Sequence, residues 1–333
     1  MMTRRAFLRG MAAVGPAAAV AMRPQGGEPV EPLETKTIRL VRIPGICVAP
    51  QYIADELLRA EGFAEVQYVR VPDGAGTYRV LAAGEADISM AFVAPFLIQV
   101  DAGNPIVMLA GVHVGCFQLV GTERVRSIHD LKGKTVAVPG LGSAPHVFIA
   151  SMAAYVGLDP QKEIQFVARP AADAMRLLAE GNVDAYLGFP PDPQELRAKK
   201  VGHVIVNSSV DRPWSQYFCC IATGNREFAR KNPQATKRAL RAILKSTDVC
   251  ALEPARAART MVEKGFTPRY DYALQAMNEI PYNKWRTYDP EDSVRFYALR
   301  LREARMIKAI PQRIVADGTD WRFLNELKRE LKG

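Results

Sequence analysis

A short pattern occurs twice in the chain, as LAAGEAD at residues 81–87 and as LAEGNVD at residues 178–184. In each copy, apolar residues at helical spacing precede a glycine, the residue that most often ends a helix. Phe92 follows the first copy at the same distance as Phe189 follows the second. The repeat predicts two related halves, each with a helix that ends at the glycine and a short strand after it.

The segments upstream of the two copies also match. The alternating segments at residues 37–43 and 134–138 each predict a strand, and each is followed by Pro-Gly. Strands and helices then alternate in both halves, which requires a mostly parallel sheet with helices on its faces. The sequence therefore predicts an α/β protein with two lobes.

Composition is that of a globular protein. The chain has 333 residues, of which 48% are hydrophobic and 24% charged, so it can bury the cores of two lobes. These values exclude fibrous and multi-span membrane classes. The formal net charge is +9. Basic residues alternate with acidic ones, as at residues 295–305, which indicates solvated helix faces and no nucleic-acid partner.

The N-terminal residues predict a targeting segment. Arg4 and Arg5 precede an uncharged apolar stretch that is too short to span a bilayer and that ends in Ala19-Val20-Ala21. This order predicts a twin-arginine export signal over residues 1–21 and a soluble periplasmic mature protein. The alternative is a basic tail followed by an alanine-rich helix.

The cysteines show no recognisable spacing. No CxxC pattern occurs and their number is odd, so neither a disulfide framework nor a metal site is predicted. One bridge could still form in an oxidising compartment. The five cysteines are Cys47, Cys116, Cys219, Cys220 and Cys250.

The predicted binding site consists of the loops that follow the strands. In an open parallel sheet, ligands bind beyond the carboxyl ends of the strands. The loops concerned are residues 44–51, 92–96, 139–146 and 189–192. Their candidate ligand-binding residues are Gly45, Ile46, Cys47, Gln51, Phe92, Val93, Gly142, Ser143, His146, Phe189 and Asp192. Gln216 and Tyr217, on a strand expected to cross between the lobes, complete the set.

Four of these candidates have a specific role and a structural alternative. Phe92 and Phe189 can form apolar walls of the site or belong to the core. Ser143 follows two glycines at an expected helix start, so its hydroxyl can hold an anionic group or serve as a plain helix cap. His146 is either a second polar anchor or an ordinary residue of the first helical turn.

Several motifs resemble the extracytoplasmic solute-binding proteins of ABC importers for nitrate, sulfonates, taurine and thiamine precursors. They are the repeated LAxG pattern, DLKGKTVAV at residues 130–138, and NREFARKNPQA at residues 225–235. The resemblance implies a type II periplasmic-binding fold. Its second lobe, residues 121–213, is inserted into a first lobe formed by residues 36–120 and 214–333, with C-terminal helices packed on the first lobe.

The resemblance also implies a function. A small organic solute, such as a sulfonate, a carboxylate or a pyrimidine-like molecule, is captured by closure of the lobes and delivered to a membrane permease and its ATPase. The binding protein is expected to be a monomer without a cofactor. The four loops lack a dense set of arginines, which argues against nitrate and favours a flat organic molecule.

An enzyme and a ligand-sensing subunit are the alternatives. One branch of the superfamily makes the thiamine pyrimidine in an iron-dependent reaction that consumes its own histidine. That branch looks cysteine-rich near its iron site, whereas this chain has no Cys-Cys-Cys-Phe-Cys run. GxxxxGK[ST], HExxH and GxSxG motifs are also missing from the sequence, so the chain is predicted not to be an enzyme.

Overall fold

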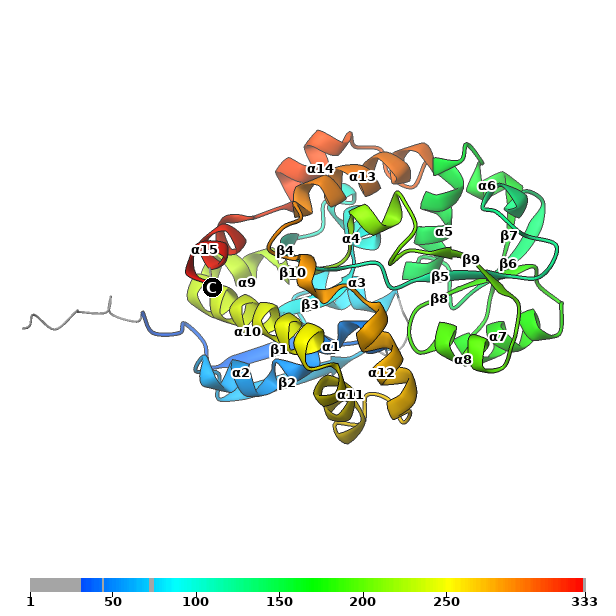
Figure 1. Ribbon diagram of the computed structural model, residues 1–333. Helices are drawn as coiled ribbons and strands as arrows, with labels where there is room; N and C mark the ends of the chain where they lie inside the picture. The colour runs from blue at the N-terminus through cyan, green and yellow to red at the C-terminus, as the bar shows by residue number, and fades with distance from the viewer. Residues whose placement is uncertain (1–30, 44, 72–74, 332–333) are drawn as a thin grey trace, which may run out of the picture. The chain divides into compact units, whose positions relative to one another are not determined.

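Two five-stranded sheets form the framework of the protein (Figure 1). The computed structural model describes residues 31–43, 45–71 and 75–331, so the predicted export signal and Pro44 lie outside the described residues. The first sheet has the order β2-β1-β3-β10-β4 and contains β1 (Thr37–Arg42), β2 (Glu65–Arg70), β3 (Ile88–Phe92), β4 (Ile106–Val114) and β10 (Phe218–Asn225). The second has the order β7-β6-β8-β5-β9 and contains β5 (Gln118–Gly121), β6 (Lys134–Val138), β7 (Ile164–Ala168), β8 (Ala185–Gly188) and β9 (His203–Asn207).

The two sheets share one topology. In the first, β1 pairs in parallel with β2 and β3, whereas β10 runs antiparallel to β3 and β4. In the second, β6 pairs in parallel with β7 and β8, whereas β5 runs antiparallel to β8 and β9. The predicted fold class, two lobes with mostly parallel sheets, is confirmed.

Helices cover the faces of both sheets. The first lobe contains η1 (Ile46–Val48), α1 (Ala49–Ile53), α2 (Asp55–Ala60), α3 (Gly76–Ala82) and α4 (Val93–Asp101). The second contains η2 (His129–Leu131), α5 (Ala144–Tyr155), α6 (Pro160–Glu163), α7 (Ala171–Ala179) and α8 (Asp192–Ala198). The remainder comprises η3 (Trp214–Gln216), α9 (Arg226–Lys231), α10 (Pro233–Leu252), α11 (Pro254–Glu263), α12 (Tyr270–Glu279), η4 (Tyr282–Lys284), α13 (Pro290–Glu303), α14 (Pro311–Gly318) and α15 (Arg322–Glu330).

The repeated sequence pattern has one structural role in both lobes. Gly84 and Gly181 follow α3 and α7 with φ of +73° each, a backbone conformation that favours glycine. Asp87 then accepts hydrogen bonds from the backbone nitrogen and the guanidinium of Arg39 on β1, at 2.7 and 2.6 Å. Asp184 accepts one from the backbone nitrogen of Thr135 on β6, at 2.9 Å. Each aspartate thus joins two neighbouring parallel strands, β1 and β3 in the first lobe and β6 and β8 in the second.

The chain passes between the lobes twice, after β4 and before β10. β5 belongs to the second sheet, so this sheet starts at Gln118, before the predicted lobe boundary at residue 121. The apolar run of β4 continues almost directly into β5, and for this reason the sequence pattern does not mark the change of sheet. The second passage runs through η3, where a strand was expected.

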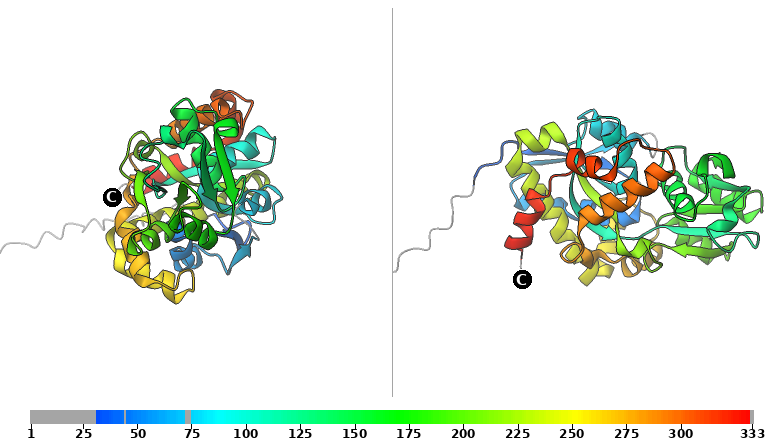
Figure 2. Two further views of the ribbon diagram at one scale, coloured as in Figure 1. Left: turned by 90° about the vertical axis from the view of Figure 1, so that its right-hand side faces the viewer. Right: turned by 90° about the horizontal axis from the view of Figure 1, so that it is seen from above.

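The C-terminal helices extend beyond the first lobe. Tyr297 on α13 contacts Phe92 of the first lobe and Phe148 of the second, with ring centroids 5.2 and 5.9 Å apart. Beyond α13, the carbonyl oxygen of Ala304 accepts a hydrogen bond from Gln161 of α6, at 3.3 Å. Figure 2 (right) shows α13, in orange, reaching the green second lobe. The resemblance implied that the C-terminal helices pack on the first lobe. The structure shows that α13 packs on both lobes.

None of the helices in the described part of the chain has both the length and the apolar character that a membrane crossing requires.

Candidate functional site

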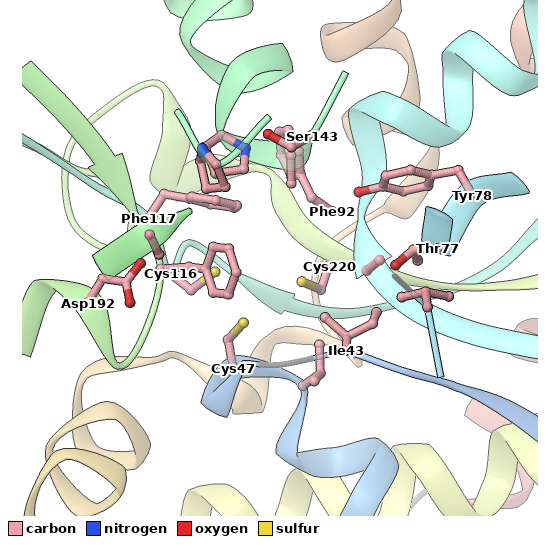
Figure 3. A pocket seen from close by; sticks show the side chains of 18 of the residues that line it. Ile43, Cys47, Thr77, Tyr78, Phe92, Cys116, Phe117, Ser143, Asp192 and Cys220 are labelled. Carbon is pink, nitrogen blue, oxygen red and sulfur yellow. The ribbon is translucent and has the colours of Figure 1, made fainter. Parts of the chain in front are cut away.

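A cavity of about 400 Å³ lies where the two lobes meet (Figure 3). Both lobes and the passage between them contribute to its wall. The lining residues are Ile43, Cys47, Val48, Val71, Thr77, Tyr78, Ala91, Phe92, Cys116, Phe117, Pro139, Ser143, Ala144, Pro145, Pro170, Ala171, Phe189, Asp192 and Cys220. A largely apolar pocket with a few polar groups is the usual character of a small-molecule site.

Five predicted residues line this cavity. Cys47 lies in η1 after β1, and Phe92 is the last residue of β3. Ser143 precedes α5 after β6, while Phe189 and Asp192 follow β8. All five lie beyond carboxyl ends of parallel strands, which is where open sheets bind ligands.

Gly45 and Ile46 lie at a direct contact between the lobes. The backbone nitrogen of Ile46 donates a hydrogen bond to the carbonyl oxygen of Pro190, at 3.0 Å. A Cβ atom on Gly45 would lie 3.0 Å from Cε2 of Phe189. Glycine at this position therefore lets the first-lobe loop approach the aromatic wall of the second lobe.

Gln51 and Val93 do not line the cavity, because both side chains are packed inside the first lobe. The Gln51 amide donates to the carbonyl oxygen of Val41 at 2.8 Å and accepts from the backbone nitrogen of Met90 at 2.9 Å. It thereby links β1 to β3. Val93 is fully buried at the start of α4.

The predicted residues His146, Gln216 and Tyr217 are also absent from the cavity lining. His146 accepts a hydrogen bond at Nδ1 from the backbone nitrogen of Gly142, at 3.1 Å. Gln216 belongs to η3, and the ring of Tyr217 stacks on Phe296 with centroids 4.0 Å apart.

Ser143 lines the cavity, but its hydroxyl proton is engaged. Its Oγ donates to the carbonyl oxygen of Gly140 at 2.6 Å, and the side chain makes no capping hydrogen bond to α5. The oxygen remains available only as an acceptor. Ser143 thus occupies the N-cap position of α5 without a capping side-chain hydrogen bond, and its role as an anion anchor stays a prediction.

The sequence prediction missed part of the wall. Thr77 and Tyr78 contribute hydroxyl groups from α3, and Phe117 joins the rings of Phe92 and Phe189 at centroid distances of 5.3 and 5.6 Å. Tyr78 lies on α3, outside the loops from which the site was predicted. Its ring packs against Phe96, and its hydroxyl points into the cavity (Figure 3).

Asp192 is the ionisable carboxyl group of the wall. Burial raises its pKa to about 6, the hydrogen bond donated by the Tyr186 hydroxyl opposes this rise, and the charge of Glu195 adds to it. The carboxyl is therefore mainly ionised at neutral pH. Among the described lining residues there is no Lys, Arg or His to balance that charge.

We expect Asp192→Asn to stabilise the protein above pH 6. The folded-state pKa of about 6 lies above the ordinary 3.8, so the native state holds a proton that the unfolded state has lost. The contribution of Asp192 to stability is fully present below about pH 4, and it is lost as the pH rises through 6. The variant avoids this loss, which amounts to about 3 kcal/mol at most. Urea unfolding between pH 4 and pH 7.5 measures the difference. Asp173→Asn, on the exposed side of α7, is the control and should show no such growth with pH.

Four residues with metal-binding groups meet beside the cavity. One ligand atom each from Cys47, His113, Cys116 and Cys220 lies within 4.8 Å of all the others, and all four residues are buried. Figure 3 shows Cys47, Cys116 and Cys220 near one another. Burial disfavours ionisation of Cys220, but hydrogen bonds from neighbouring thiols hold its pKa well below the ordinary value. Sequence spacing could not predict this cluster, because its members come from distant segments.

Solved structures with the same fold include several binding proteins. The alkanesulfonate-binding protein of Xanthomonas axonopodis pv. citri, with MOPS bound, has a TM-score of 0.71 at 18% identity and covers 87% of this chain and 100% of that chain. The periplasmic nitrate-binding protein of Synechocystis PCC 6803 has a TM-score of 0.74 at 16% identity, with 91% and 90% covered. At these identities the likeness concerns the fold, and it confirms the predicted periplasmic-binding architecture.

Curated relatives are of two kinds. The taurine-binding periplasmic protein of Escherichia coli is 27% identical over 187 residues, which is 55% of this chain and 57% of that protein. A 4-amino-5-hydroxymethyl-2-methylpyrimidine phosphate synthase of Saccharomyces cerevisiae is 23% identical over 221 residues, 62% of each chain. The match thus spans less than two thirds of these relatives. A model of the NMT1-like family matches residues 31–263.

Proposed function

The chain belongs to the NMT1-like family, and from this premise we propose that it is a solute-binding protein that captures a small organic molecule between its lobes. The main support is the cavity, whose wall combines Phe92 from the first lobe with Phe189 from the second. A ligand that contacts both lobes stabilises their closed arrangement, because each of its contacts is complete only there.

The chemistry of the wall favours a neutral or weakly basic flat molecule. Phe92, Phe117 and Phe189 offer aromatic surfaces, and Asp192 offers an acceptor for an N–H group. An anion would lie near this carboxylate without a cation among the described lining residues, which is unfavourable in a buried site. An amino-substituted pyrimidine-like solute fits this wall better than a sulfonate, a carboxylate or nitrate.

Export and transport complete the proposal. We infer that the protein works in the periplasm and delivers its ligand to a membrane permease and its ATPase. The support is the family, together with the periplasmic taurine-binding and nitrate-binding proteins to which the chain is similar.

A thermal-shift series at pH 7.5 tests the ligand class. Aminopyrimidines, taurine with other sulfonates, and nitrate are compared at equal concentrations. Binding at about 100 times the Kd stabilises the native state by about 2.7 kcal/mol, which raises the melting temperature. We expect this rise with aminopyrimidines. A rise with sulfonates or nitrate alone would reject the proposed ligand class, and no rise with any set would count against solute binding.

Phe189→Ala should weaken binding of any compound that raises the melting temperature. The ring is half-buried, lines the cavity and packs against Phe117, so its removal takes away ligand contact and little core. We expect the Kd measured by calorimetry to rise at least about fivefold, which corresponds to about 1 kcal/mol. Phe228→Ala, on α9 outside the cavity lining, is the control and should leave the Kd unchanged. An unchanged Kd for Phe189→Ala would remove Phe189 from the site.

A synthase is the second candidate, because yeast relatives with this activity match part of the chain. The two functions differ in what happens to the bound molecule. A binding protein returns its ligand unchanged, whereas a synthase forms a new product. Mass spectrometry of the ligand after long incubation separates them, and we expect the ligand to be recovered intact.

A further inference from the structure

We propose that Cys47, His113, Cys116 and Cys220 form a binding site for one thiolate-preferring metal ion of the zinc class. The proposal goes beyond solute capture and does not depend on which molecule the cavity binds. One sulfur or nitrogen atom of each residue lies within 4.8 Å of the other three. In a tetrahedral zinc site with Zn–S bonds near 2.3 Å, ligand atoms are separated by about 3.8 Å. Small side-chain rotations are enough to reach this geometry.

His113 supplies the second observation that indicates a ligand. It is fully buried in β4, and its Nδ1 lies 3.0 Å from the carbonyl oxygen of Val114. A carbonyl oxygen only accepts, so Nδ1 carries the proton and Nε2 presents a lone pair. This Nε2 is buried and has no hydrogen-bond partner. A buried polar atom left in this way is costly, and coordination of a metal ion would satisfy it.

Neighbouring groups hold the ligands in position. The Tyr282 hydroxyl donates a hydrogen bond to the carbonyl oxygen of Cys47 at 3.1 Å, and its ring packs edge-on against His113 with centroids 5.3 Å apart. The hydrogen bond between His113 and the backbone fixes the imidazole orientation. Contacts that orient the ligand residues in this way are typical of metal sites.

The donor set decides the type of ion and the type of site. Three sulfurs and one imidazole favour zinc and related ions, and they disfavour magnesium and calcium, which prefer oxygen. Four protein ligands complete a tetrahedron and leave no open position, which is the pattern of a structural site. Cys116 lies in the first passage between the lobes, after β4, and Cys220 lies near the start of β10, just after the second passage. The ion would therefore join both of these segments to η1 of the first lobe.

The cysteines also provide matched controls. Cys219 neighbours Cys220 on β10 and its Sγ lies 3.5 Å from that of Cys116, but it is outside the group of four. Cys250 is fully buried in α10 and is likewise outside the group of four. Cys219→Ser and Cys250→Ser should therefore keep the metal, whereas Cys220→Ser and Cys47→Ser should lose it.

The experiment uses the full chain, reduced and handled without oxygen. Zn²⁺, Co²⁺ or Mg²⁺ is added, the loosely bound ion is removed with a weak chelator, and the retained metal is measured by mass spectrometry. We expect about one equivalent of zinc and none of magnesium. The cobalt form should show thiolate charge-transfer absorption and the intense visible bands of a tetrahedral centre. Cys220→Ser should lower zinc affinity more than about 100-fold. Loss of a residue that only orients a metal ligand already lowers affinity by up to about 100-fold, and Cys220 is itself a ligand.

The wild-type cobalt spectrum keeps the test decisive even where a variant fails to fold. Absence of retained zinc, equal retention of magnesium, or an octahedral cobalt spectrum would each overturn the proposal. Equal zinc affinity in wild type and Cys220→Ser would do so as well. A Cys116–Cys219 disulfide in the untreated protein, combined with no metal uptake after reduction, would overturn the proposal. It would assign the cysteines to redox chemistry instead.

Discussion

Replacing Phe148 by alanine is expected to lower the free energy of unfolding by about 3–5 kcal/mol. Phe148 is fully buried on α5 of the second lobe. Its ring lies 4.8 Å from that of Phe92, 5.2 Å from Phe117 and 5.3 Å from Trp214 between centroids. These partners come from the first lobe and from the two passages between the lobes. Alanine would leave a cavity among these rings and remove the aromatic contacts that Phe148 makes with them.

Urea unfolding followed by circular dichroism measures this loss. Phe166→Ala is the matched control, because Phe166 is half-buried on β7 and packs edge-on against His146. It should cost clearly less than Phe148→Ala, since less apolar surface returns to water. A Phe148→Ala protein that unfolds at the same urea concentration as Phe166→Ala would show that the interlobe aromatic cluster adds little stability.

The topology was predictable because its determinants are neighbours in the sequence. Gly84 and Asp87 are three residues apart, as are Gly181 and Asp184, and each pair ends a helix and ties the next strand to the first one. A duplicated local motif therefore reports a duplicated sheet. The start of β5 was not predictable in this way, because the change of sheet depends on pairing with β8 and β9, which lie far along the chain.

The position of the cavity was predictable from the sequence, but the side chains that enter it were less predictable. The loops after β1, β3, β6 and β8 do surround the cavity, as a parallel sheet requires. Which side chains enter it depends on the local backbone. His146 lies in the first turn of α5 and accepts a hydrogen bond from Gly142, while Tyr78 reaches the cavity from a helix that the loop rule does not cover.

The cluster of Cys47, His113, Cys116 and Cys220 could not be predicted from the sequence at all. His113 and Cys116 are close in sequence, but Cys47 and Cys220 come from other segments, and no short spacing pattern connects them. Zinc motifs are recognised when ligands follow one another in pairs. A site assembled from separate strands becomes visible only when the pairing of β4 with β10 is known.

Gln51→Leu is expected to destabilise the protein by about 2–4 kcal/mol without acting on ligand binding directly. The Gln51 side chain is fully buried and pairs with the carbonyl oxygen of Val41 and the backbone nitrogen of Met90. Leucine has a similar volume but leaves both backbone groups without a partner in the core. Each such group costs about 1–3 kcal/mol, and this is the reason for the expected loss.

The measurement combines urea unfolding with the Kd of the folded variant for a compound found by thermal shift. Gln67→Leu, on the exposed side of β2, is the control and should change stability by less than about 0.5 kcal/mol. A Gln51→Leu protein with lower stability and an unchanged Kd would establish that this residue of α1 supports the sheet. Wild-type stability combined with a large rise in Kd would instead place Gln51 in the ligand site, which its two hydrogen bonds inside the first lobe argue against.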